Sequence, residues 1–544
     1  MSSWTKLDED LGPERGDDDF LTDDEENQAH RNNYEPSEAE TESEVGRPEG
    51  IAISAPNNNA WPQSYWQSID MYTNVMTPPS LPSLTFMRSR GPSFSSLSSF
   101  VKWQQAPDDN SSQLSGKLLA SEASLEKEGL AASSPPTLSA KNSVCELPPP
   151  KEHSCSFSQA VLNGINVLCG MGLITTPYAI KEGGWLSLIL LALFGVICCY
   201  TGILLMRCLE SCPGLRTYPD IGQAAFGSTG RLILSIILYL ELYGACVEFL
   251  TMMGDNLAAI FPNTHIAFAG IHLQSHEIFA ITATLVVLPT VWLQNLSLLS
   301  YLSVGGVGAS ILVAILLLWV GAVNQVGFHH SGSALNLSGL SVTIGIYGFG
   351  YAGHSVFPNI YTSMRKPSQF PAVLLTCGAF CFFMYTGVAI CGYLMFGDSV
   401  RSQFTLNMPE EFVASKIAVW TTIVNPMTKY ALTITPVALS LEELFPVAWM
   451  GSHLASILTR TVLVLSTLVV ALSFPFFGAV MALMGSLLAM LVAIIFPGVC
   501  YLILLKGRLT KSQITTCVFV IMLGVLCSII GTYSSITKIA EQMD

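Results

Sequence analysis

Apolar residues form long unbroken stretches over the C-terminal two-thirds of the chain and are sparse before it. From Phe157 onward, apolar stretches long enough to cross a bilayer as a helix alternate with short polar breaks. We predict about eleven transmembrane helices of roughly 20 residues each, over residues 157–180, 184–209, 231–260, 276–293, 296–323, 340–361, 370–396, 412–443, 454–474, 479–505 and 513–536. The fold class is therefore an all-α integral membrane domain over residues 154–544.

The first 150 residues have a different pattern. Acidic clusters at residues 17–19 and 23–26 lead into Ser- and Pro-rich sequence with few apolar runs. Such a segment cannot bury enough apolar surface to offset its chain entropy, so we predict a disordered cytosolic tail over residues 1–150, available to cytosolic partners. The run Arg88–Ser93 places arginines just before Ser93. This pattern indicates a phosphorylation site near Ser93, and an unmodified linker serine is the alternative.

The charge of the chain lies almost wholly in that tail. Of 544 residues only 12% are charged, about half the fraction typical of a soluble protein. Residues 1–150 contain 24 Asp and Glu against 10 Lys and Arg, which gives −14, and residues 151–544 contain 15 of each, which gives zero. Lipid is therefore the expected solvent for the helical domain. Nothing in the chain is basic enough to predict nucleic-acid binding.

The cysteines and the familiar catalytic motifs argue against a metal centre or an enzyme. The 14 cysteines include no CxxC pair, and most lie inside apolar runs, where they act as small apolar side chains. The sequence also contains neither HExxH nor GxSxG. We therefore predict no metal site, no cofactor and no enzymatic activity.

Basic residues orient the predicted bundle. With the N-terminus in the cytosol, nine lysines and arginines, Arg460 among them, fall on the cytosolic side and four on the other side, as the positive-inside rule requires. An odd number of helices then places the C-terminus on the non-cytosolic side. Asn336 begins an Asn-Leu-Ser sequon on that side. It is a candidate glycosylation site, and an unused sequon is the alternative.

Two of the predicted helices contain glycine-rich interruptions. The first contains Gly170 and Gly172 and the sixth contains residues 347–354, and in both a proline follows a glycine by five positions, Pro177 after Gly172 and Pro358 after Gly353. Irregular backbone at membrane depth is tolerated only inside protein or beside a water-filled cavity. Interrupted helices in corresponding positions of two halves are typical of inverted-repeat transporters. The alternative is close helix packing through small residues.

The interruptions predict a site for both ends of an α-amino acid. A half-helix that starts at the break offers free N–H groups and the positive end of its dipole to a carboxylate. Unwound carbonyls of the other broken helix can accept hydrogen bonds from an ammonium group. The predicted carboxylate site is Gly170, Met171, Gly172 and Leu173. The predicted amine site is the carbonyls of Tyr347, Gly348 and Phe349, and the residues predicted to shape the side-chain pocket are Tyr351 and His354.

Acidic residues lie along the third predicted helix. Glu241, Glu248 and Asp255 are seven residues apart and therefore share one helix face. Glu241 and Glu248 are at mid-membrane depth, where an ionised carboxylate is costly and a proton can bind reversibly. Reversible protonation is what proton coupling requires, and protons are the only coupling ion we predict. The alternative is a structural hydrogen bond or ion pair.

A lysine lies in the middle of the eighth predicted helix. Lys429 follows Pro426, which loosens the helix there. Its ammonium could stand where a related transporter would hold Na⁺, or it could pair with a carboxylate of the third helix. We predict a coupling or structural role for Lys429 together with Glu241 and Glu248.

Several of these runs resemble a known family. Residues 166–173 with Pro177, residues 392–397 and residues 425–430 resemble the amino acid/auxin permease superfamily, and the similarity extends from Ser154 to the C-terminus. Within it the chain resembles the vacuolar amino acid transporters of plants and yeast, kin to the vesicular inhibitory amino acid transporter. The long acidic, Ser-rich tail fits that branch.

The resemblance implies a LeuT/APC-like architecture, a five-plus-five inverted repeat with an eleventh helix. It implies proton-coupled transport of neutral amino acids, and in the vacuolar branch an exchange of luminal protons for cytosolic amino acids. It also carries a substrate-binding role onto Asn166 and onto both breaks. We therefore expect a proton/amino acid antiporter in the vacuolar or another acidic organelle membrane, working by alternating access. The alternatives are a plasma-membrane proton symporter and an amino-acid sensor that signals through its tail.

Overall fold

The computed structural model describes residues 61–62, 65, 155–268, 271–293, 297–324, 326–329, 332–445 and 453–543. They belong to one compact unit, Ile53–Asp544. Most of the predicted tail, Ser93 included, lies outside the described residues. The tail residues that are described are Trp61, Pro62 and Tyr65.

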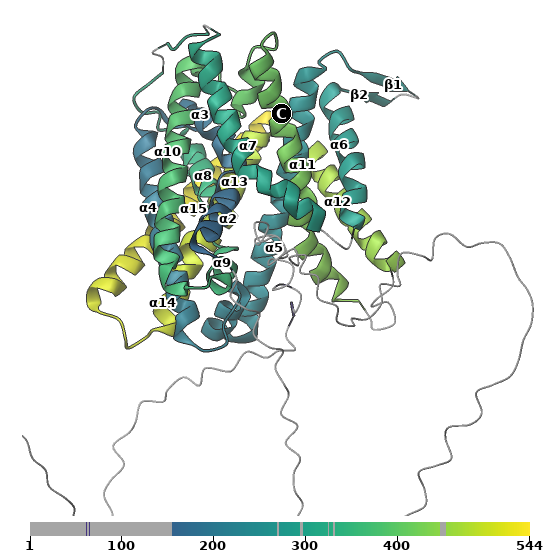
Figure 1. The fold of residues 1–544 in the computed structure, drawn as a ribbon. Helices are drawn as coiled ribbons and strands as arrows, with labels where there is room; N and C mark the ends of the chain where they lie inside the picture. The colour runs from purple at the N-terminus through teal and green to yellow at the C-terminus, as the bar shows by residue number, and fades with distance from the viewer. Residues whose placement is uncertain are drawn as a thin grey trace, which may run out of the picture. The chain divides into compact units, whose positions relative to one another are not determined.

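Helices occupy every range that the apolar pattern marks as a span (Figure 1). In chain order the elements are α2 (Phe157–Leu168), α3 (Met171–Gly183), α4 (Ser187–Ser211), α5 (Tyr218–Ile260), β1 (Ile266–Phe268), β2 (Ile271–Leu273), α6 (Ser275–Trp292), α7 (Ser297–Ala322), α8 (Leu340–Gly350), α9 (Phe357–Ser363), η1 (Pro367–Gln369), α10 (Phe370–Phe396), η2 (Gly397–Ser399), η3 (Phe404–Asn407), α11 (Val413–Glu442), α12 (His453–Ser473), α13 (Phe477–Met484), η4 (Gly485–Ala489), η5 (Leu491–Ile495), α14 (Phe496–Leu504) and α15 (Lys511–Met543).

Length and hydropathy identify fewer spans than the sequence pattern does. Among the described residues eight helical stretches are long and apolar enough to cross a membrane, and the bent pair α2–α3 is a ninth. The other two predicted ranges hold the short helix α8 with α9, and α11, which has 30 residues but is more polar. The fold is thus a helical bundle with several membrane spans.

The central helices pack around the interrupted ones. α3 contacts both α8 and α10, and α11 contacts both α5 and α7. Figure 1 shows α9 and the start of α5 at one end of the bundle, and the end of α15 at the other, where the β1–β2 hairpin also lies. The hairpin, with Ile266 opposite Leu273, was not predicted. It lies between α5 and α6, in a polar stretch without the length of a span.

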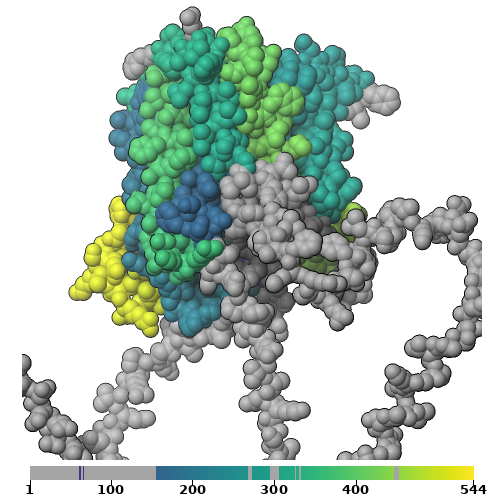
Figure 2. Space-filling view, viewed as in Figure 1, coloured from purple at the N-terminus to yellow at the C-terminus, as the bar shows by residue number. Residues whose placement is uncertain are grey.

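The outer surface of the bundle is apolar. Figure 2 shows α2, in dark blue, beside α10, in green, at the surface of the molecule. Leu375 and Phe383 of α10 have 67% and 71% of their surface exposed. Soluble proteins rarely expose contiguous apolar patches of this kind, so these side chains are placed to contact lipid.

A glycine divides α5 into two parts. Gly227 has φ 73° and ψ −162°, which is not helical and which a residue with a Cβ rarely adopts. The part before it is a short helix that begins at Tyr218 and is capped by Thr217, whose hydroxyl accepts a hydrogen bond from the Asp220 N–H. The long part after it corresponds to the predicted span 231–260.

The range predicted as the tenth span contains two π-helical turns, η4 and η5, between α13 and α14. At the start of η4 the backbone approaches α8 closely. A Cβ on Gly485 would overlap the Gly345 carbonyl, and a Cβ on Gly345 would overlap the Ala482 carbonyl. Glycine at both positions therefore lets the two backbones meet, as at small-residue contacts between membrane helices.

We predict that Gly485→Val lowers the stability of the protein. Overpacking typically costs about 1–3 kcal/mol, and here the neighbour is backbone that cannot rotate away. The measurement is the fraction of detergent-solubilised protein that remains monodisperse after stepwise heating. Gly387→Val is the matched control, because Gly387 is exposed on α10 with nothing within 4 Å of the added Cβ. Equal heat resistance of the two variants would contradict the close contact.

Candidate functional site

The first glycine interruption separates two helices. α2 ends at Leu168, α3 begins at Met171, and the pair is bent by 49°. Gly170 precedes α3 and has no side chain to cap it. The Gly170 and Leu173 N–H groups already donate to the Leu168 and Gly170 carbonyls, at 2.9 and 3.2 Å, so the predicted carboxylate site is corrected to the N–H groups of Met171 and Gly172. Gly172 packs against the backbone of α8, since a Cβ there would lie 2.8 Å from the Gly350 Cα.

The second interruption lies later than predicted. α8 continues to Gly350, and residues 351–356 form the non-helical link to α9. The Tyr347 and Phe349 carbonyls are not bare, because they accept the Tyr351 and Ala352 N–H groups at 3.3 and 3.0 Å. The amine site predicted at residues 347–349 is therefore corrected: two of its three carbonyls already have backbone partners.

A tyrosine connects the two interruptions. The Tyr385 hydroxyl of α10 lies 2.5 Å from the Leu168 carbonyl oxygen and 2.8 Å from the Gly350 carbonyl oxygen. These are the last residues of α2 and α8, whose final carbonyls have no partner within their own helix. Tyr385 is thus a site residue that sequence reasoning missed, because one tyrosine in an apolar helix carries no recognisable pattern.

A cavity of about 120 Å³ lies at the first interruption, between α5, α7, α11 and the α8–α9 link. Seven of the predicted site residues line it: Gly170, Met171, Gly172, Leu173, Glu241, Phe349 and Lys429. Its other described lining residues include Ser310, Asn425 and Phe249, which were not predicted. Six predicted residues are not among those that line it: Asn166, Glu248, Tyr347, Gly348, Tyr351 and His354.

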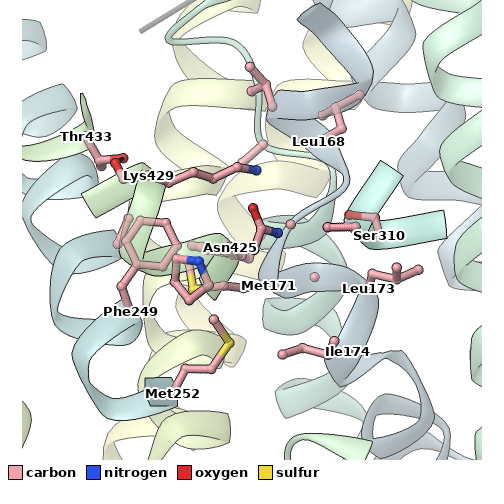
Figure 3. A pocket seen from close by; sticks show the side chains of 18 of the residues that line it. Leu168, Met171, Leu173, Ile174, Phe249, Met252, Ser310, Asn425, Lys429 and Thr433 are labelled. Atoms are coloured by element: carbon pink, nitrogen blue, oxygen red, sulfur yellow. Dashed lines mark hydrogen bonds between the residues drawn. The ribbon is translucent and has the colours of Figure 1, made fainter. Parts of the chain in front are cut away.

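The cavity has a polar and an apolar part (Figure 3). Lys429, Asn425 and Ser310 lie on one side, and Phe249, Met252 and Ile174 on the other. Both parts lie beside the start of α3. The site can therefore accommodate a molecule that has charged groups at one end and an apolar group at the other.

The lysine reaches the end of α2 rather than a carboxylate. The Lys429 ammonium donates a hydrogen bond to the Asn166 carbonyl oxygen at 3.1 Å. Gly306 of α7 leaves room for this contact, because a Cβ there would overlap the Asn166 side chain. Within the described part of the chain Lys429 forms no ion pair within 4.0 Å, so its predicted alternative, pairing with a carboxylate of the third helix, is not seen.

Tyr347, Tyr351 and His354 support the site from outside it. The Tyr347 hydroxyl lies 3.2 Å from the Ser187 hydroxyl of α4. His354 Nε2 lies 3.0 Å from the Thr201 hydroxyl, also of α4. The Tyr351 ring packs edge-on against Tyr385. Their described contacts therefore fix the interrupted helix α8–α9 against its neighbours.

The three acids of α5 lie in different surroundings. Glu241 lines the cavity. Glu248 has only 1% of its surface exposed, and neither of its carboxyl oxygens has a hydrogen-bond partner among the described residues. Asp255 is paired, with His276 Nδ1 of α6 and with the Gln403 amide nitrogen, both at 2.9 Å. An ionised carboxylate is therefore best supported at Asp255 and is most costly at Glu248.

Two further predictions concern the glycosylation sequon at Asn336 and the absence of a metal site. Asn336 lies in the loop before α8, half-buried, and its side-chain oxygen accepts a hydrogen bond from Ser338 at 2.7 Å. Its glycosylation stays a prediction. Over the residues that the structure describes, no group of three or more His, Cys, Asp or Glu side chains could hold a metal ion.

A multi-pass helical bundle with a central, partly polar cavity at a broken helix has the architecture of a membrane transport protein. The chain belongs to the family of transmembrane amino acid transporter proteins, whose model matches residues 153–537. This confirms the resemblance to the amino acid/auxin permeases.

Plant relatives match almost the whole chain. It is 60% identical over 493 residues to amino acid transporter AVT1D of Arabidopsis thaliana, covering 90% of this chain and 89% of that protein. It is 53% identical over 525 residues to AVT1E of the same plant, covering 94% and 97%. Among solved structures, a Na⁺-coupled sialic acid symporter matches with 10% identity and a TM-score of 0.42, over 69% of this chain and 89% of that one.

Proposed function

We propose that this protein exchanges protons for neutral amino acids across the membrane of an acidic organelle such as the vacuole. The observation that carries the proposal is the uncapped start of α3, which faces a cavity also lined by Glu241 and Lys429. Family membership makes an amino acid the expected cargo, and this cavity has the groups that such a zwitterion needs.

The substrate carboxylate binds at the start of α3. The N–H groups of Met171 and Gly172 carry the positive end of the α3 dipole, and the Lys429 ammonium lies on the same side of the cavity. The amine binds at the carbonyl end of α2, near Val167, where the helix dipole is negative. This assignment replaces the carbonyls of Tyr347 and Gly348, which do not line the cavity.

The apolar part of the cavity favours substrates with uncharged side chains. Ile174, Phe249 and Met252 line it, and in the lining as described Glu241 and Lys429 are the charged residues. A charged substrate side chain would lose its water of hydration in this apolar part and find no group of opposite charge there, which is costly. We therefore propose neutral amino acids, apolar ones above all, as the cargo.

Glu241 is the proposed proton carrier. It lines the cavity, whereas Glu248 is buried in the bundle and does not line the cavity. A group that must exchange protons with each side in turn has to be reachable from the transport pathway. Glu248 is the second candidate for a coupling role. As a buried carboxyl, it would help to transmit the effect of proton binding through the bundle.

The proposed topology has eleven spans in a five-plus-five inverted repeat plus α15, with a cytosolic N-terminus and a luminal C-terminus. The α2–α3 and α8–α9 interruptions support the repeat, because they lie in corresponding positions of the two halves. The basic residues still favour this orientation. Nine lysines and arginines fall on the cytosolic side and four on the other.

The test is transport by the full-length protein in liposomes with an acidic lumen and a pH dye inside. We expect external leucine or another neutral amino acid to raise the luminal pH while radiolabelled substrate enters. Aspartate and lysine should do neither, and protein-free liposomes provide the background. Substrate entry that lowers the luminal pH would instead indicate a symporter, and entry that ignores the pH gradient would refute proton coupling.

A further inference from the structure

Three tail residues are packed into the bundle although they lie far ahead of α2 in the chain. Tyr65 has only 1% of its surface exposed, Pro62 is buried and Trp61 is half-buried. A large aromatic side chain that is fully buried contributes strongly to the binding energy of a segment. These residues therefore belong to the packed structure of the protein.

Arg231 holds the backbone of this segment. Its guanidinium donates hydrogen bonds to the Trp61 carbonyl at 3.2 Å and to the Pro62 carbonyl at 2.9 Å. The same guanidinium is held by Asp220 at 2.6 Å and by Gln223 at 3.0 Å, both from the first part of α5. Arg231 is thus positioned by α5 and presents its remaining donors to the segment.

The aromatic rings of the segment pack between α5 and α11. Trp61 and Tyr65 both contact the Tyr239 ring of α5 edge-on, with centroids 5.6 and 6.0 Å apart. The Trp61 indole N–H donates to the Ser440 carbonyl of α11 at 2.9 Å. Removing the segment would leave the Tyr239 ring and the Ser440 carbonyl without these partners.

Tyr65 contacts a residue in the wall of the cavity. Its hydroxyl donates a hydrogen bond to the Ser355 carbonyl at 3.3 Å. Ser355 lies in the α8–α9 link and lines the cavity, and so does Glu241, two residues after Tyr239. The segment thus spans the gap between α5, α11 and the α8–α9 link, on one side of the proposed site.

We propose that Trp61, Pro62 and Tyr65 form a docked plug that closes the pathway between the cavity and the side of the membrane on which the tail lies. Ser355 cannot move away from α5 and α11 while Tyr65 and Trp61 tie these three elements together. Transport would then require release of the plug, and the docking site made by Arg231, Tyr239, Ser355 and Ser440 is an intramolecular receptor for it. The inference rests on the proposed transport function.

The test compares two double variants of the full-length protein in the liposome assay. Trp61→Ala/Tyr65→Ala removes the rings that dock. Trp4→Ala/Tyr34→Ala is the matched control, because it removes the same residue types from the tail ahead of the docked residues. If the plug is docked about two-thirds of the time, its loss raises the transport rate about threefold. The control variant should transport at the rate of the unmodified protein.

A peptide added in trans separates plug loss from a change in the fold. A synthetic peptide of residues 55–70 should bind the Trp61→Ala/Tyr65→Ala protein and return its rate to that of the unmodified protein. The same peptide with both aromatic residues replaced by alanine should do neither. A rate that is unchanged or lower in the double variant, or a peptide that does not bind, would overturn the proposal. Peptide binding, measured by fluorescence anisotropy, also distinguishes its failure from a failure of the transport function.

Discussion

Replacing Gly172 by valine should lower the rate of amino acid transport by about 10- to 100-fold. The added Cβ would lie 2.8 Å from the Gly350 Cα and 3.5 Å from the Tyr385 hydroxyl. The Gly350 atom is backbone and cannot rotate aside, so α3 must move away from α8. Overpacking of this kind costs about 1–3 kcal/mol, which corresponds to roughly that loss of rate if the strain falls on the transport-competent state.

The measurement is the initial rate of radiolabelled uptake per folded protein, with folding monitored by size-exclusion chromatography. Gly387→Val serves again as the control, because it adds the same side chain to a glycine with open space around it. Normal transport by Gly172→Val would mean that the start of α3 tolerates displacement from α8. The proposed carboxylate site would then be untenable.

Glu241→Gln should abolish the substrate-driven change in luminal pH, with a loss of at least about tenfold, while substrate binding is retained. Glutamine has nearly the same shape as glutamate but cannot release a proton at any working pH. Glu241 lines the cavity but lies outside the backbone groups proposed to hold the substrate. The residual transport of the variant should therefore show little dependence on pH.

Two further glutamate variants make this result interpretable. Glu410→Gln removes an exposed loop carboxylate and should leave both readings unchanged. Glu248→Gln removes the buried carboxyl that does not line the cavity, and we expect it to slow transport without removing the coupling. Loss of coupling in Glu248→Gln together with normal coupling in Glu241→Gln would transfer the proton-carrying role to Glu248.

The spans and the first interruption could be read from the sequence because each depends on local chemistry. Apolar runs set the spans, and Gly170 with Gly172 leaves α3 uncapped at its start. The second interruption was placed too early because three glycines, at positions 348, 350 and 353, gave equivalent signals. In the structure Gly345 and Gly348 serve helix packing, against Ala482 and Met490. The glycines of this region therefore serve both predicted purposes, helix interruption and close helix packing, at different positions.

The roles of single polar residues could not be predicted, because they depend on contacts between distant parts of the chain. The seven-residue spacing placed Glu241, Glu248 and Asp255 on one face of α5. It could not show that this face passes from the cavity through the buried interior to a pairing with His276. Tyr385 and Tyr65 act through segments far from them in sequence, and nothing in their local sequence marks either role.

The position of Tyr385 has a consequence for how the bundle can rock. Its hydroxyl carries one proton but faces two carbonyl oxygens, so it can satisfy only one of them at a time. If α2 moves away from α8, the Tyr385 hydroxyl can donate to whichever of the two carbonyl oxygens stays near it. The number of hydrogen bonds that Tyr385 donates then does not change. Tyr385 can therefore keep a hydrogen bond in either orientation of the two helices, so this contact alone does not oppose their separation.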